Sequence, residues 1–133
     1  MNSDLEFQFR IGKVSAVFPE RHTAKVFFED NDNVVSAELP ILVPFTGKNK
    51  VYALPDVNDS VACISQLNSE TEGDGFILGS FYNDVDKPKA NNQEICRLDF
   101  GDGSFFEFDR ATGNFEIHCT GEIKITGAKI FLN

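Results

Sequence analysis

The feature that most constrains the fold of this chain is a strict alternation of apolar and polar residues near its C-terminal end. Phe115, Ile117, Cys119, Gly121, Ile123 and Ile125 alternate with Glu116, His118, Thr120, Glu122, Lys124 and Thr126. A period of two residues is the period of a β-strand, so the first set is predicted to lie on a buried face and the second on a solvated face. Around Gly127 the phase shifts by one residue, and Ala128, Ile130 and Leu132 continue the apolar set. This shift predicts a bulge or a corner in the strand.

Short runs rich in Val, Ile and Phe, separated by turn residues, make up the rest of the chain, and apolar residues do not recur at helical spacing over three turns. The chain is therefore predicted to be all-β. The strands predicted before residue 84 span residues 7–18, 23–28, 36–43, 60–67 and 75–82. Closing five short antiparallel strands into a barrel removes exposed edges, and the five-stranded Greek-key barrel known as the OB-fold fits this pattern. An incomplete sandwich is the alternative.

A polar segment separates two parts of the chain. Residues 84–92 contain Pro88, and their only apolar residues are Val85 and Ala90. This composition is typical of an exposed connector, so we predict a barrel domain over 1–83, a connector over 84–92 and a second domain over 93–133. The second domain begins with a predicted hairpin, in which Cys96, Leu98 and Phe100 face Phe106 and Phe108 across a two-residue turn at Asp102–Gly103.

The second domain has no predicted helix to cover its apolar face. Hairpins and one long alternating strand cannot bury such a face within a single chain. The simplest cover is the same surface on identical chains, and three chains wrapped around an axis form a prism with the apolar residues inside. We therefore expect a homotrimer whose core contains Phe106, Phe108, Phe115, Ile117, Cys119, Ile123, Ile125 and Ile130.

The net charge argues against nucleic acid as a partner. The 133 residues include 12 basic and 21 acidic residues, which give a formal net charge of −9, and no stretch collects basic residues into a patch. No apolar run approaches the ~20 residues of a membrane span, and Met1–Glu6 carries acids where a signal peptide has positive charge. We expect a chain without a signal peptide that is assembled in the cytoplasm of the producing cell.

The residues that carry chemistry are sparse. Cys63, Cys96 and Cys119 are too widely spaced for a zinc site, and their odd number does not suit a disulfide framework. His22 and His118 are the only histidines, and the sequence has no Ser, His and Asp signature. We predict no enzymatic activity and no catalytic, cofactor-binding or metal-binding residue. A metal held by three Cys119 thiols on the trimer axis is the alternative to packed apolar thiols.

Several short motifs follow one another in order along almost the whole chain. They are Arg10, Gly12, Lys13 and Val14 near the start, Leu39–Pro40, Tyr52–Val57, Gly79–Asn83 and the hairpin Asp102–Ser104, followed by the repetitive strand from Phe115 to Leu132. In this combination the chain resembles the central spike proteins of contractile injection systems, the phage baseplate assembly protein V group and the related VgrG spikes of type VI secretion. The resemblance implies an N-terminal OB-fold, a C-terminal intertwined triple-stranded β-helix and a homotrimer.

The resemblance also implies a structural function at the centre of a contractile-tail baseplate. The trimer would form a collar on the tail tube, contact the baseplate hub proteins, and carry a needle that transmits force to puncture the target envelope. The expected location is the baseplate of a phage virion, a tailocin or another injection system.

Two departures from the family pattern matter. The family commonly has glycine after the Pro55–Asp56–Val57 step, whereas this chain has Asn58, which can adopt a left-handed conformation and preserve the turn. Longer members continue into a pointed apex, in some cases with iron-binding histidines, and no such segment follows Leu132 here. We therefore expect Ile130, Phe131 and Leu132 to form a blunt apolar end on which a separate PAAR-like tip protein docks.

Two other functions are alternatives. The barrel could be a ligand-binding OB-fold for an oligosaccharide or single-stranded nucleic acid, with Phe27, Phe28 or Phe45 as stacking surfaces. The chain could also be a secretion-system spike that loads effectors.

Overall fold

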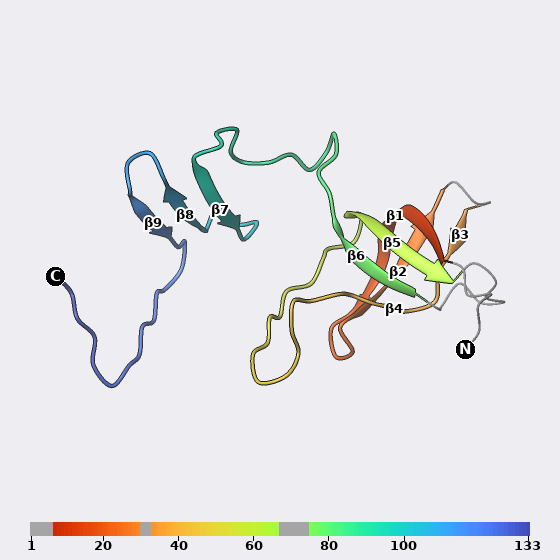
Figure 1. Ribbon diagram of the computed structural model, residues 1–133, viewed down its shortest axis with the longest axis horizontal. Helices are drawn as coiled ribbons and strands as arrows, with labels where there is room; N and C mark the ends of the chain where they lie inside the picture. The colour runs from red at the N-terminus through yellow and green to blue at the C-terminus, as the bar shows by residue number, and fades with distance from the viewer. Residues whose placement is uncertain (1–6, 30–32, 67–74) are drawn as a thin grey trace. The chain divides into compact units, whose positions relative to one another are not determined.

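The computed structural model describes residues 7–29, 33–66 and 75–133, and within these ranges the chain is all-β, with strands and no helix (Figure 1). The prediction of an all-β chain is confirmed for these residues. The chain divides into two compact units, Met1–Lys87 and Pro88–Asn133, called unit 1 and unit 2 below. The strands form two separate sheets, and every strand pair within them is antiparallel.

Unit 1 is built on a six-stranded sheet with the order β3-β2-β1-β5-β6, in which β4 also pairs with β2. The long strand β1 lies in the middle, because it pairs with β2 along one edge and with β5 along the other. The bounds are Phe7–Phe18 for β1, Thr23–Phe28 for β2, Val34–Val35 for β3, Leu39–Pro40 for β4, Ser60–Gln66 for β5 and Gly75–Ser80 for β6.

The two ends of this sheet are linked at one point. Ile41, directly after β4, forms an isolated parallel bridge with Ile77 of β6. The Leu42 N–H donates a hydrogen bond to the carbonyl of Ile77, with an N···O distance of 3.0 Å, and the Ile41 N–H donates to the carbonyl of His22. The sheet therefore curves until its ends meet, but over residues 7–29, 33–66 and 75–87 no continuous ladder closes it into a barrel.

The core of unit 1 lies on one side of this curved sheet. In β2, the side chains of Ala24, Val26 and Phe28 are buried, and the residues between them are half-buried. The fully buried apolar residues are Val14, Ala24, Val26, Phe28, Leu39, Val61, Cys63 and Ile77. Arg10 is buried on the same side, and its guanidinium carbon lies 3.7 Å from the centroid of the Phe28 ring. This cation–π contact accommodates a charge beside the apolar core.

Most of the strands predicted for unit 1 agree with the structure. Those at 7–18 and 23–28 have the predicted bounds, that at 60–67 is β5 throughout its described residues, and that at 75–82 exists as the shorter strand β6. Residue 67, the last of the predicted 60–67 strand, lies outside the described residues, as do Met1–Glu6. Asn58 has a φ of 79°, so the predicted left-handed conformation is confirmed, and its N–H donates to the carbonyl of Val14.

The predicted strand over 36–43 is wrong in its extent. Only Leu39–Pro40 is a strand, and it pairs with β2. At Ile41 the backbone pairing changes from β2 to β6. Pro40 has no N–H to donate, which limits the ladder that this segment can form.

Unit 2 contains a three-stranded sheet with the order β7-β8-β9, formed by Ile95–Asp99, Phe105–Asp109 and Phe115–His118. The predicted two-residue turn at Asp102–Gly103 is wrong. The Phe100 N–H donates to the carbonyl of Ser104, so the loop has three residues, and its two glycines have φ values of 87° and 96°. Each glycine supplies a left-handed conformation that other residues adopt at a cost.

The alternation over 115–126 predicts a long strand, but in the structure only Phe115–His118 forms one. Residues 119–133 contain no strand and no ladder pairing within the described chain. The predicted phase shift at Gly127 therefore falls in a segment without strand structure.

Candidate functional site

One face of the unit 2 sheet is apolar and exposed. Direct cross-strand pairs place Leu98, Phe106 and Ile117 in one row across the three strands, and Cys96, Phe108 and Phe115 in a second row. We call these six residues the unit 2 apolar face. Exposure of its large side chains ranges from 38% for Phe108 to 62% for Phe115. The rings of these two residues are 6.3 Å apart. This contact lies within one row, and much of the face remains open to water.

The opposite face of the same sheet is covered by a polar network. Arg97 donates from Nε to Asp99, at 2.9 Å, and from Nη1 to Glu107, at 2.8 Å. Its guanidinium carbon lies 3.8 Å from the centroid of the Phe105 ring, which also stacks on His118. The hydrogen bond to Glu107, followed by that to Asp99, raises the pKa of Arg97. The charged and aromatic groups of this face therefore contact one another within the chain.

Asp102 fastens the segment after β9 to the loop between β7 and β8. Its Oδ1 accepts the Ser104 N–H and its Oδ2 accepts the Thr120 hydroxyl, both at 2.8 Å. The Thr120 N–H in turn donates to Ser104 Oγ at 3.1 Å. The N–H of Ser104 is the main cause of a lowered pKa for the Asp102 carboxyl, and the Thr120 hydroxyl adds to it. We call these hydrogen bonds among Asp102, Ser104 and Thr120 the clasp. They fix the position of Thr120 and so the direction of the chain after β9.

The predicted trimer-core residues fall into three groups. Phe106, Phe108, Phe115 and Ile117 lie on the unit 2 apolar face, as the alternation predicts. Cys119, Ile123 and Ile125 follow β9 and, with Phe100, Phe106 and Ile117, line an open hollow of about 450 Å³. Ile130 is not among the residues of this hollow, and the residues beside it, Phe131 and Leu132, are almost fully exposed.

Three residues of this surface are absent from the predicted trimer core. Cys96 and Leu98 belong to the unit 2 apolar face, and Phe100 packs its ring edge-on against Phe106, with centroids 5.3 Å apart. The sequence does indicate these three residues, because they alternate in phase with the apolar face of the predicted hairpin.

The cysteines and histidines do not form a metal site in the part of the chain that the structure describes. No group of three or more His, Cys, Asp or Glu side chains is placed there to hold an ion. Cys63 is buried, and this burial raises the pKa of its thiol to about 11, against a smaller opposing effect of Arg10. Cys96 and Cys119 are exposed, and the Cys119 thiol donates to the carbonyl of Glu122. His22 lies against Tyr52, with ring centroids 5.5 Å apart.

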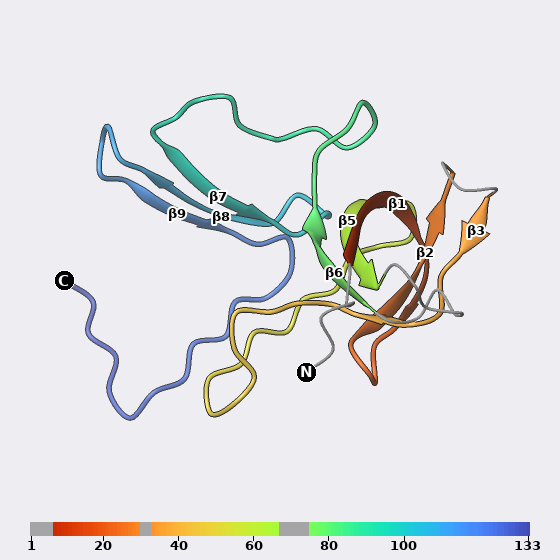
Figure 2. The same ribbon diagram turned by 45° about the vertical axis from the view of Figure 1, so that its right-hand side comes forward.

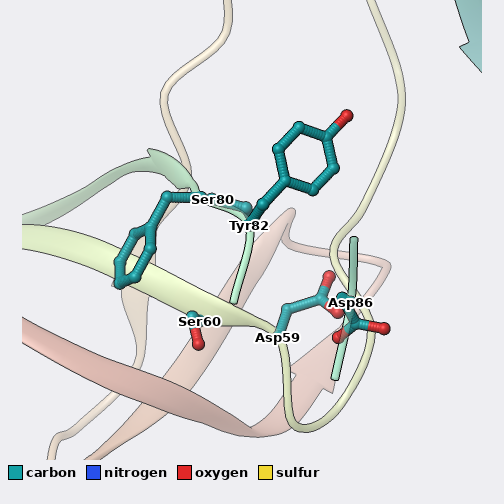
Figure 3. Close-up of a pocket in the computed structure, with 6 residues that line it drawn as sticks. Asp59, Ser60, Ser80, Tyr82 and Asp86 are labelled. Carbon is teal, nitrogen blue, oxygen red and sulfur yellow. The ribbon is translucent and has the colours of Figure 1, made fainter. Parts of the chain in front are cut away.

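A hollow of about 440 Å³ lies in unit 1, where β5 begins and β6 ends (Figure 3). It is lined by Asp59, Ser60, Ser80, Phe81, Tyr82 and Asp86. Asn83 shapes it, because its amide donates to Ser60 Oγ at 2.7 Å and accepts the Asp86 N–H at 2.7 Å. Figure 3 shows the ring of Tyr82 pointing away from the two carboxylates. The lining residues offer two carboxylates and two serine hydroxyls, with no histidine or cation among them.

No protein-family model matches the chain, and no curated protein matches it either. Among the described residues, none forms a helix with the length and apolarity needed to cross a membrane.

Proposed function

We propose that this chain is the structural central spike protein of a contractile-tail baseplate and that it works as a homotrimer. The observation that carries the proposal is the exposed unit 2 apolar face, whose six residues form two rows across three strands. Its opposite face is already covered by the network around Arg97. Three chains that turn their apolar faces toward a common axis remove this surface from water.

In the proposed trimer, unit 2 forms an intertwined triple-stranded β-helix. Residues 119–133 have no ladder partner within the described chain, and buried backbone N–H and C=O groups need one. Neighbouring chains would supply the partners, which joins the three segments into a prism. Unit 1 would be an OB-fold collar, and the support for this is an antiparallel sheet whose two ends are linked by the Ile41–Ile77 bridge.

The collar would sit on the tail tube and contact the baseplate hub proteins, while the prism would transmit axial force to the target envelope. Interchain hydrogen bonds and packed apolar rows give such a prism its stiffness. Phe131 and Leu132, with exposures of 86% and 94%, would dock a PAAR-like tip protein together with Ile130. The protein would then be a component of a phage, tailocin or injection-system baseplate.

Immunogold electron microscopy of contractile tails purified from the producing cell tests this function. An antibody raised against the purified chain should label the baseplate end of each tail, and antibody pre-adsorbed with the same chain should not label it. Labelling along the sheath, or tails that carry no label while the chain remains in the unassembled fraction, would contradict the proposed function.

A further inference from the structure

Unit 1 carries a second exposed apolar surface, on the outer face of strands β1, β5 and β6, which lie side by side in Figures 1 and 2. Phe9 pairs directly with Ile64, and Ile64 pairs directly with Phe76, so the three side chains form one row across the sheet. In β1 and β6 the residues next to this row, Arg10 and Ile77, are buried on the core side. We call the surface formed by Phe7, Phe9, Ile11, Ile64, Phe76 and Leu78 the unit 1 outer face.

The exposed apolar area of this face is large. Its phenylalanines are 58% (Phe7), 62% (Phe9) and 44% (Phe76) exposed. At ~200 Å² for a fully exposed aromatic side chain, these fractions amount to roughly 300 Å². Ile11 and Leu78, each about half exposed, bring the total to roughly 400 Å² at ~100 Å² per aliphatic side chain. A patch of this size is comparable to the largest apolar patch of a typical protein, and such patches are often functional.

This area fits an interface between two copies of the chain. Two outer faces together supply roughly 800 Å² of apolar surface. A stable interface buries at least about 1,200 Å² in total, and about 65% of a homodimer interface is apolar, which is also roughly 800 Å². The match places the outer face at the lower end of the range for specific, stable interfaces.

The absence of charged residues from this face favours the same partner, a second copy of the chain. None of its six residues is charged, although the chain as a whole carries a net charge of −9. Lys13, two positions beyond Ile11 on the same side of β1, is where the apolar stretch of this strand ends. Two copies can therefore meet through this face without bringing their acidic groups together. A partner selected by charge would find no charged group here to pair with.

We propose that the unit 1 outer face binds a second copy of this chain, through an interface separate from that of unit 2. Unit 1 thus takes part in self-association through its own apolar surface. The inference does not require the spike function, because its observations lie wholly within β1, β5 and β6.

Sedimentation of the full chain across a wide dilution series tests this interface. Ile117→Asp places a charge on the unit 2 apolar face and so removes the contribution of unit 2 to self-association. We expect the Ile117→Asp chain still to associate as its concentration rises. Adding Phe9→Asp should raise its dissociation constant at least about 100-fold, because a carboxylate would be buried without a partner. The matched control adds Val35→Asp, which introduces the same charge at an exposed position on β3 outside the outer face.

Circular dichroism and amide NMR spectra establish that each variant keeps the sheets of both units. If Phe9→Asp does not fold, Leu78→Asp places the charge on the same face from β6 and is expected to have the same effect on association. The inference is overturned if the Ile117→Asp chain is a 14.8 kDa monomer at every concentration. Equal effects of Phe9→Asp and Val35→Asp would overturn it as well.

The same series separates this inference from the proposed function. A wild-type trimer that becomes fully monomeric with Ile117→Asp would support the spike and refute the outer-face interface. A wild-type dimer that dissociates with Phe9→Asp, but not with Ile117→Asp, would support the outer-face interface and refute the spike.

Discussion

Replacing Ile117 with aspartate should abolish the trimer while leaving the monomer folded. The side chain is 51% exposed in the single chain, so about half of its burial energy, ~1 kcal/mol, is gained only on assembly. A carboxylate buried without a partner costs several kcal/mol more. Over three chains, the loss is on the order of 10 kcal/mol, which weakens trimer formation by roughly 10⁷-fold.

Analytical ultracentrifugation at concentrations too low for the unit 1 outer face to associate measures this loss as a fall in mass to that of one chain. His118→Asp is the matched control, because His118 is the next residue in β9 and stacks on Phe105 on the opposite face of the sheet. Losing that stack costs about 1 kcal/mol of monomer stability and should leave the trimer intact. Equal dissociation by the two variants, or a trimer that persists with Ile117→Asp, would refute the assignment of the faces.

Three further predictions concern single residues. Gly75→Ala should lower the free energy of unfolding by about 2 kcal/mol in thermal denaturation, because the added Cβ would lie 2.2 Å from a carbonyl oxygen of β5. Gly79→Ala is the control and should not lower it, because a Cβ there meets nothing within 4 Å. Asp102→Asn should remove an acid-dependent loss of structure followed by NMR. The pKa of this carboxyl is lowered in the folded chain, so its stabilisation is present above its ordinary pKa of about 4 and is lost as pH falls through the folded value. Maleimide should modify Cys63 far more slowly than Cys96 in the dissociated chain, because the Cys63 thiol is buried and its pKa is raised to about 11.

Each of these predictions has a clear contrary result. Equal unfolding temperatures for the two glycine variants would show that the sheet relaxes around the added methyl group. An unchanged acid transition in Asp102→Asn would show that the clasp to Thr120 does not stabilise unit 2. Equal labelling of Cys63 and Cys96 in the folded chain would contradict the burial of Cys63.

The strands of unit 1 were predictable because local patterns determine them. The runs 7–18 and 23–28 contain β-branched and aromatic residues between turn residues, and both form strands over these ranges. The turn at Asn58 was also predictable, since asparagine tolerates the left-handed conformation that the position requires. The segment 36–43 was not, because its pairing depends on the distant strand β6, which Ile41 meets across the sheet.

The interaction surfaces were predictable only in part. In unit 2, apolar and polar residues alternate strictly, so the face of Phe115 and Ile117 could be assigned before the structure. In β1, both sides contain apolar residues, and the side with Arg10 is the one that faces the core. The outer face with Phe7 and Phe9 therefore became visible only with the exposure of each side chain. The same alternation continues beyond His118, yet residues 119–133 form no strand with the described residues of this chain.

The most direct test of the proposed spike is the mass of the purified chain in solution. Light scattering across a dilution series should give a mass that does not fall below three times 14.8 kDa on dilution, because three chains cover the unit 2 apolar face together in the proposed trimer. A stable monomer of 14.8 kDa would contradict the proposal, since the face would then remain in contact with water at every concentration.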